Sequence, residues 1–112
     1  MEVKLDAVFK TFDDNDVKDV DESGVEKPLS LQKVLVNSIA KPDPQASGVE
    51  LAKRYDLSMR VHKAENVVYM SAEEISMAKK LIPSTYNAPL IVGQAYRFLD
   101  PPEEEVVEQP KA

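Results

Sequence analysis

Proline residues limit how long any helix of this chain can be. Pro42 and Pro44 follow one apolar helical stripe, Pro83 lies within another, and Pro89 and Pro101 bracket the last. Proline lacks a backbone N–H and excludes the helical region for the residue before it, so a helix begins, ends or kinks near each position. The chain is therefore predicted to contain several short helices.

Four segments have the apolar spacing of amphipathic helices, and serines precede three of them. Ser47 with Glu50, and Ser71 with Glu74, have the spacing of capping boxes, in which the serine accepts from the third helical amide and the glutamate reaches back. Gly93 within the last helix costs about 1 kcal/mol relative to Ala, which predicts a close helix crossing there. We expect helices over residues 31–40, 48–63, 72–83 and 89–99.

The N-terminal segment has the alternating pattern of a strand. Apolar residues alternate along Val3–Lys10, turn residues follow at 13–16, and Val17–Val20 can return as a second strand of a β-hairpin. Val67–Met70 suggests a third short strand. The predicted fold is α+β with a helical majority: an N-terminal β-hairpin packed on about four short α-helices. Residues 1–99 form a single domain in this prediction, and residues 100–112 a flexible acidic tail rich in Pro and Glu.

Charge is distributed unevenly along the chain, whose net charge is −6. Residues 13–26 contain seven acids and one lysine, and residues 100–112 contain five acids and one lysine. Residues 27–99 contain ten Lys/Arg and six Asp/Glu. This pattern indicates solubility with attraction between tail and body, or a partner with a basic surface. Lysines and arginines on the second and third helices could form a weak nucleic-acid footprint, a solvated face or a docking site for the tail. The sequence pI of about 4.8 disfavours nucleic acid.

One segment resembles a calcium loop in part. Asp19, Asp21 and Ser23 have the spacing of the first three EF-hand ligands, but Ser30 stands where the bidentate glutamate belongs. An acidic solvated turn is the preferred interpretation, with weak calcium binding as the alternative. His62 is the only histidine and has no second residue with which to form a triad or a metal site. We therefore expect no catalytic activity and no cofactor.

The C-terminal acidic stretch is a candidate partner-binding segment. It combines three consecutive acids with an apolar pair, and such a segment can fold onto a basic groove of a partner. A disordered solubilising tail without a partner is the preferred interpretation, with partner binding as the alternative. The candidate binding residues are Glu103, Glu104, Glu105, Val106 and Val107.

Composition also gives an expectation of location. The chain has no cysteine, and no apolar run approaches the roughly 20 residues of a membrane helix. We expect a protein of a reducing compartment with no membrane partner.

Several motifs together resemble a known group of proteins. The strand Lys4–Lys10, followed by an aspartate-rich turn, precedes the segment Pro28–Asn37; Lys53–Tyr55, Ser71–Ile75 and Ala88–Tyr96 follow later. This arrangement is similar to small proteins of unknown function encoded by tailed bacteriophages and prophages, over roughly residues 3–99. The resemblance implies a location in the host bacterial cytoplasm or in the virion, and it supplies no catalytic residues.

Two roles compete under this resemblance. One is a virion assembly or structural accessory protein that binds other phage proteins. The other is an inhibitor or regulator of a host protein that presents an acidic, DNA-like surface. Residues Pro89–Val92 are apolar nearly all round, which also predicts either deep burial or a homodimer.

Overall fold

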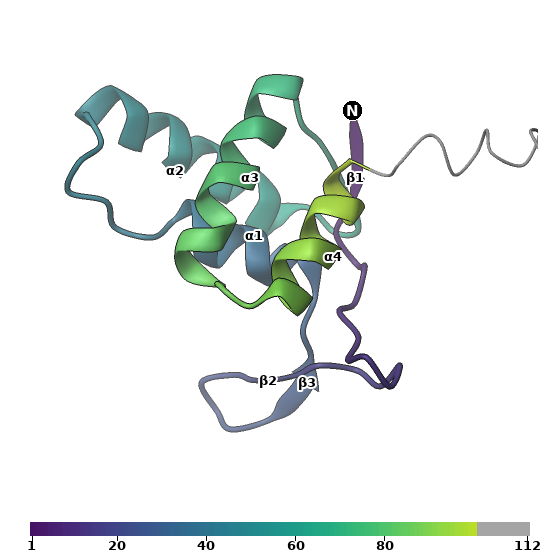
Figure 1. Cartoon of the computed structure of the whole chain (residues 1–112). Helices are drawn as coiled ribbons and strands as arrows, with labels where there is room; N and C mark the ends of the chain where they lie inside the picture. The colour runs from purple at the N-terminus through teal and green to yellow at the C-terminus, as the bar shows by residue number, and fades with distance from the viewer. Residues whose placement is uncertain (101–112) are drawn as a thin grey trace, which may run out of the picture.

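Four helices and two small antiparallel sheets make up the computed structural model, which describes residues 1–100 (Figure 1). The helices contain 9, 16, 14 and 11 residues, whereas each of the four strands contains 3. The predicted α+β class with a helical majority is therefore confirmed. The helices are α1 (Leu31–Ile39), α2 (Gly48–Lys63), α3 (Ala72–Thr85) and α4 (Pro89–Leu99).

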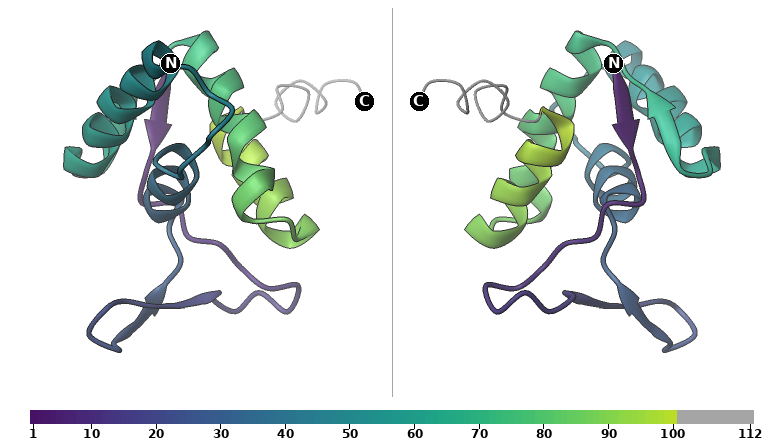
Figure 2. Two further views of the ribbon diagram at one scale, coloured as in Figure 1. Left: turned by 90° about the vertical axis from the view of Figure 1, so that its left-hand side faces the viewer. Right: turned by 90° about the vertical axis from the view of Figure 1, so that its right-hand side faces the viewer.

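Helix α1 is the centre of the hydrophobic core. Its residues Leu31, Val34, Leu35 and Ile39 are each at most 1% exposed. Helices α2, α3 and α4 all pack against α1, and Figure 2 shows it enclosed between them. Ser30 caps its N-terminus by accepting from the Lys33 amide at 3.3 Å.

The N-terminal strand pairs with a distant segment. Strand β1 (Glu2–Lys4) is antiparallel to β4 (Val67–Tyr69), with buried Val3 opposite buried Val68. The third short strand expected from the sequence is thus confirmed as β4. The pair joins residues more than 60 positions apart.

The predicted pairing of Val3–Lys10 with Val17–Val20 is wrong. The chain does turn back, because Val17 N–H donates to the Phe9 carbonyl at 2.9 Å, but no continuous ladder forms. Instead, β2 (Lys18–Val20) pairs with β3 (Glu26–Pro28), which gives the hairpin of the fold. Alternation identifies which face of a strand is buried but not which strand lies beside it, and here the strand that pairs with β1 is β4.

The two predicted capping boxes differ. Ser71 and Glu74 form the complete box, with the Ser71 hydroxyl bonded to the Glu74 amide and the Glu74 carboxylate to the Ser71 amide. Ser47 caps α2 through the Glu50 amide at 3.1 Å. The Glu50 carboxylate, however, turns to Arg54 one helical turn later, so only half of that box is made.

Helix α3 continues through Pro83 to Thr85 because another helix satisfies the carbonyl that proline leaves unbonded. The amide of residue 83 would ordinarily donate to the Lys79 carbonyl, four residues earlier. In its place, the Tyr96 hydroxyl of α4 donates to that carbonyl at 2.6 Å. The sequence predicts that this helix ends or kinks at Pro83. The structure instead continues α3 to Thr85.

Substitution of Tyr96 by Phe should lower the free energy of unfolding by about 1–2 kcal/mol, because the Lys79 carbonyl loses its donor. In a Pro83→Ala background the restored amide can serve that carbonyl, so the same substitution should cost less. Denaturant unfolding of the four variants in this double-mutant cycle measures the difference. An equal cost in both backgrounds would contradict the compensation.

The close helix crossing predicted at Gly93 is wrong. A Cβ placed on Gly93 would meet no atom within 4 Å, and the residue is exposed. No packing requirement of the described residues therefore explains this glycine.

Gly93→Ala should raise the free energy of unfolding by about 0.5–1 kcal/mol, since alanine loses less backbone entropy in a helix and meets no neighbour here. Thermal or denaturant unfolding measures the change. A destabilised variant would contradict the open space found around this residue.

Candidate functional site

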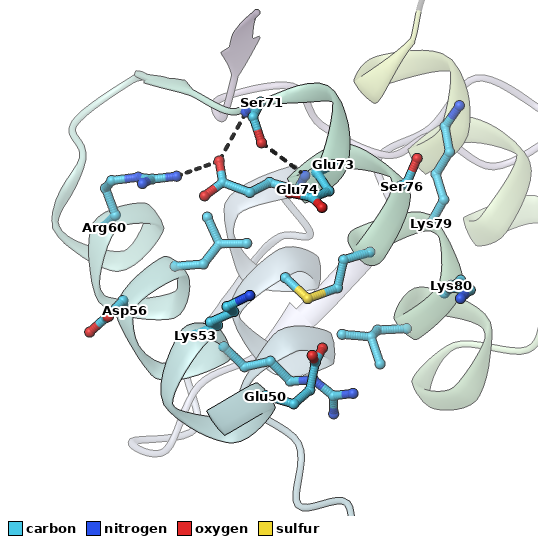
Figure 3. A pocket seen from close by; sticks show the side chains of 14 residues that line it. Glu50, Lys53, Asp56, Arg60, Ser71, Glu73, Glu74, Ser76, Lys79 and Lys80 are labelled. Atoms are coloured by element: carbon cyan, nitrogen blue, oxygen red, sulfur yellow. Dashed lines mark hydrogen bonds and ion pairs between the residues drawn. The ribbon is translucent and has the colours of Figure 1, made fainter. Parts of the chain in front are cut away.

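A groove runs between α2 and α3. Both helices pack on α1 and enclose a hollow of about 880 Å³ (Figure 3). Its apolar lining consists of Leu57 from α2 with Met77 and Leu81 from α3, all packed against the hydrophobic core. A cavity of this size with an apolar base and polar walls is suited to a short peptide segment or a small ligand.

One end of the groove is closed by an ion pair. Arg60 near the end of α2 contacts Glu74 near the start of α3 at 2.6 Å, and Glu74 also accepts from the Ser71 amide at 2.9 Å (Figure 3). Partial burial raises the pKa of Glu74, but the bonds from Arg60 and Ser71 outweigh it and hold the pKa below its ordinary value. The two walls are thus fastened together at this end.

The other end of the groove carries two lysines, with Glu50 near them (Figure 3). Lys53 on α2 and Lys80 on α3 line opposite walls, and within residues 1–100 neither has an ion-pair or hydrogen-bond partner (Figure 3). Lys79, beside Lys80, contacts Asp100 at 3.1 Å and lies 5.6 Å from the ring centre of Tyr96. The lining also includes the acids Glu50, Asp56, Glu73 and Glu74, so the walls above the apolar base carry charges of both signs.

The first half of the α2 wall is held by charge rather than by packing. The buried residues of α2 all lie in its second half, whereas Leu51 and Tyr55 are exposed. Arg54, whose side chain is 12% exposed, binds Asp43 of the preceding connector at 3.1 Å. The Gln45 amide and Arg54 together lower the pKa of Asp43. This ion pair therefore fixes the open end of the groove.

A second surface is the acidic arm, defined here as residues 10–28. It extends from the helical body as a turn on one side and the β2–β3 hairpin on the other (Figures 1 and 2). Its tips expose apolar side chains: Phe12 is 91% exposed, Val20 57% and Val25 51%. Three lysines accompany the seven acids of the arm, which are Asp13, Asp14, Asp16, Asp19, Asp21, Glu22 and Glu26.

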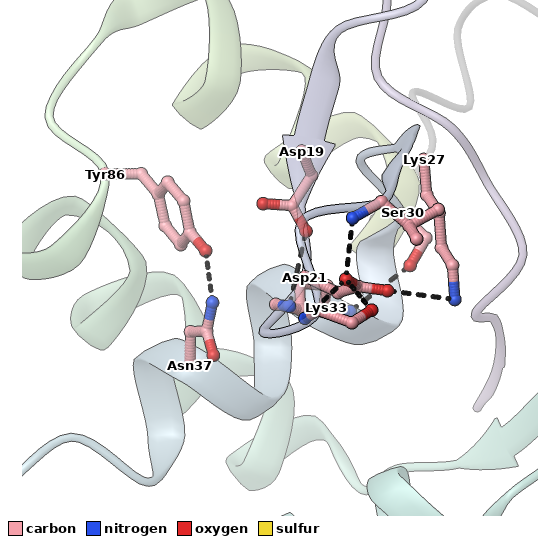
Figure 4. A network of polar contacts seen from close by, with 9 residues as sticks. Asp19, Asp21, Lys27, Ser30, Lys33, Asn37 and Tyr86 are labelled. Atoms are coloured by element: carbon pink, nitrogen blue, oxygen red, sulfur yellow. Dashed lines mark hydrogen bonds and ion pairs between the residues drawn. The ribbon is translucent and has the colours of Figure 1, made fainter.

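Side chains of two helices of the body contact the arm. The Gln94 side chain of α4 accepts from the Lys10 amide at 2.9 Å and donates to the Lys10 carbonyl at 2.7 Å. Asp19 of β2 contacts Lys33 of α1 at 3.2 Å (Figure 4). Phe9, fully buried just before the arm, packs edge-on against Phe98 with ring centres 5.2 Å apart.

The turn that carries Phe12 has its own hydrogen bonds. Thr11 donates to the Asn15 carbonyl at 2.7 Å, and Asp14 adopts a left-handed φ of 68° that aspartate tolerates. Lys10 contacts Asp16 at 2.6 Å across the base of the turn. The exposed aromatic ring is therefore presented from an ordered turn.

The candidate calcium ligands have other partners. Oδ1 of Asp21 accepts from the Ser23 amide at 2.9 Å, the Ser23 hydroxyl at 2.8 Å and the Val25 amide at 3.0 Å, and Oδ2 lies 3.6 Å from Lys27 (Figure 4). Asp19 is paired with Lys33. Among residues 1–100, no three His, Cys, Asp or Glu side chains are grouped to hold a metal ion. The geometry thus gives Asp21 the role of closing the hairpin loop, in which Gly24 has a left-handed φ of 86°.

The pKa of Asp21 should be about 2, because the Ser23 hydroxyl, the Val25 and Ser23 amides and Lys27 all favour its charged form. The ordinary value is 3.8, so the contribution of Asp21 to stability is complete above that pH and lost as the pH falls toward 2. Carboxyl NMR titration measures this pKa, and Ser23→Ala should raise it. The pKa of Asp16, lowered by its bond from Lys10, should not move. An Asp21 pKa near 3.8 in the unmodified protein would contradict the loop geometry.

The remaining sequence-based candidates lie beyond the described part of the chain. Glu103, Glu104, Glu105, Val106 and Val107 fall outside residues 1–100, as does the predicted tail except for Asp100. The homodimer and the boundary between domain and tail stay predictions. Helix α4 does bury Ile91, Ala95 and Leu99, and Leu90 and Val92 are partly buried, so much of its apolar surface is packed within one chain.

Sequence reasoning identified the charges of both surfaces but not the surfaces themselves. The basic residues were expected to share a face, and the structure brings five of them to the groove: Lys53, Arg54, Arg60, Lys79 and Lys80. Lys63 does not line it. The anchoring of the arm by Gln94 was missed, because no sequence pattern connects a glutamine with a backbone amide 84 positions away.

Comparison with protein-family models, with curated proteins and with solved structures gives no match to this chain. No helix within residues 1–100 combines the length and the hydrophobicity needed to cross a bilayer. The functional argument therefore depends on the two surfaces.

Proposed function

We propose that this chain is a non-catalytic accessory protein of a tailed phage or prophage that acts by binding another protein, most simply in virion assembly or structure. The observation that carries the proposal is the exposure of Phe12, 91%, at the tip of an acidic arm that the body holds in place. The phage setting comes from the sequence resemblance alone.

The chemistry of the arm specifies the kind of partner. Aromatic side chains are enriched among the residues that contribute most to binding, because one ring buries a large apolar area with few rotatable bonds. Acids around the ring attract a basic surface and repel an acidic one. The partner that fits is a protein with an apolar socket surrounded by Lys or Arg. Because the arm is already ordered, little conformational entropy is lost when it binds.

A second candidate function is inhibition of a host nucleic-acid-binding protein. It is favoured by the position of the arm's acids on an ordered hairpin and turn, since a DNA mimic needs its negative charges on a fixed surface. The two functions differ in partner: a phage structural protein in the first, and a host protein whose binding is competed by duplex DNA in the second.

A photo-crosslinking amino acid at position 12 should capture the partner in infected or lysogenic cells, because it replaces one exposed aromatic ring with another. The matched control is the same amino acid at Tyr55, an aromatic residue that is 64% exposed on α2. Mass spectrometry of the crosslinked product then distinguishes a phage structural protein from a host protein.

With the purified partner, Phe12→Ala should weaken binding about 10- to 100-fold, the cost of truncating a central interface aromatic. Tyr55→Ala should leave the affinity unchanged, and added salt should weaken binding by the wild-type chain. Both variants should keep the wild-type circular dichroism, since both side chains are exposed. Equal affinities for the wild type and Phe12→Ala, or crosslinks from position 55 alone, would refute the proposal.

A further inference from the structure

The sheet formed by β1 and β4 has a feature that the proposed role of the arm does not use. Strand β4 exposes two apolar side chains, with Tyr69 70% exposed and Val67 40%. It has β1 on one side and no strand of residues 1–100 on the other, and Figure 2 shows the two strands side by side at the outside of the molecule. An apolar strand with an open edge is a template for pairing with another chain.

The open edge presents backbone groups without partners. In an antiparallel ladder, successive residues point their N–H and C=O groups alternately to either side. Met70 points both groups to β1, because its amide donates to the Met1 carbonyl at 2.9 Å and its carbonyl accepts from the Met1 amino group at 2.8 Å. Val67 and Tyr69 therefore point theirs outward, and within residues 1–100 those groups have no hydrogen-bond partner.

We propose that β4 pairs with β4 of a second copy of this chain, antiparallel, about a two-fold axis that passes between the two Val68 residues. This register places Val67 of each copy opposite Tyr69 of the other. Because both residues point their backbone groups outward, each opposed pair exchanges two hydrogen bonds. Their side chains share one face, where an aromatic residue opposite a β-branched residue makes a favourable contact. The two small sheets thus join into one.

Charges on either side of β4 suit the same symmetry. Lys63 ends α2 before the strand, and Glu73 lies in the first turn of α3 after it, at equal sequence distances from Val68. Both are exposed, and neither has an ion-pair partner within residues 1–100. Antiparallel pairing brings Lys63 of each copy and Glu73 of the other to the same end of the paired strands. Parallel pairing would bring like charges together, so charge favours the antiparallel arrangement.

The other charges near the strand do not oppose this register. Glu65 falls opposite Ser71 of the other copy, which is uncharged. Arg60 and Glu74 are already paired with each other within one chain at 2.6 Å. No two like charges therefore lie directly opposite each other between residues 60 and 76 of the two copies.

The outer edge of β1 is less suited to pairing. The residues that point outward there are Glu2 and Lys4, both exposed, and charged side chains protect sheet edges from association. Strand β1 also lies against α4. In the joined sheet these charged residues flank the apolar centre on both sides, which is the polar rim of an ordinary interface.

The size of the contact sets its strength. Stable protein interfaces bury about 1,200–2,000 Å² in total, and a strand of three residues with two helix ends offers less. We therefore expect a dissociation constant of about 0.1–1 mM, weaker than that of a permanent dimer. The dimer carries two acidic arms, but the pairing does not depend on what the arm binds.

The test follows the full chain from well below to well above this concentration. In sedimentation experiments, the mass should rise from the monomer value of 12.5 kDa toward twice that value. Over the same range, hydrogen exchange measured by NMR should slow at the Val67 and Tyr69 amides, which gain partners. The Glu2 and Lys4 amides, at the other edge, should keep their exchange rates. A mixture of isotope-labelled and unlabelled chains should show contacts between Val67 of one copy and Tyr69 of the other.

Substitution of the exposed aromatic tests the strand contact. Tyr69→Lys should weaken association at least 10-fold, and the fold should be retained because residue 69 is exposed and lies opposite Glu2 of its own chain. The matched control is Tyr55→Lys, the same change at an aromatic residue that is 64% exposed on α2, and it should associate as the wild type does. Phe12→Ala should also associate normally, which separates this pairing from binding by the arm.

A charge exchange tests the symmetry. Lys63→Glu places like charges at each end of the paired strands and should weaken association about 3- to 10-fold, whereas Lys63→Glu combined with Glu73→Lys should restore it. Four outcomes would each overturn the proposal: a monomer mass at every concentration, association without slower exchange at Val67 and Tyr69, normal association of Tyr69→Lys, or no recovery in the exchanged variant. Circular dichroism of every variant confirms that the fold is kept.

Discussion

Burial of one short helix is the constraint on which the rest of this structure depends. The nine residues of α1 bring four aliphatic side chains to almost zero exposure, and the other three helices take their positions from contact with it. Complete burial of such side chains contributes roughly 1.5–3 kcal/mol each. A helix this short would not be stable alone, so its formation and the packing of its neighbours must be cooperative. The groove follows from this arrangement, because α2 and α3 both pack on α1.

The helices of this fold were largely predictable, because their ends are specified locally. A serine cap or a proline determines each start from nearby residues, as Ser71 and Glu74 illustrate for α3. Strand partners are not local: β1 pairs with β4 across most of the chain, and no nearby residue identifies that partner. The extension of α3 through Pro83 was equally hidden, since it depends on a hydroxyl group from α4. Gly93 shows the reverse error. Its low helix propensity was explained by a close helix crossing, and the described residues contain no such crossing.

The candidate surfaces were predictable in charge and not in shape. Uneven spacing of acids and bases along the sequence indicated an acidic turn and a mildly basic body. Side-chain geometry decides whether such acids bind a cation or accept hydrogen bonds from the protein. Asp21 does the second, because it accepts from the Ser23 and Val25 amides. Likewise, the groove depends on the angles at which α2 and α3 pack on α1. The sequence of either helix alone does not indicate those angles.

The contact between Gln94 and Lys10 has a consequence for how this chain can tolerate length changes. One side-chain amide bonds both polar groups of a single backbone unit, as a neighbouring strand residue would. The position of the arm therefore depends on the rotational phase of α4. Insertion of one residue before Gln94 would turn its side chain by about 100° and separate it from Lys10. The connector at residues 40–47 has no helical phase to preserve, but its length must still let Asp43 reach Arg54 of α2.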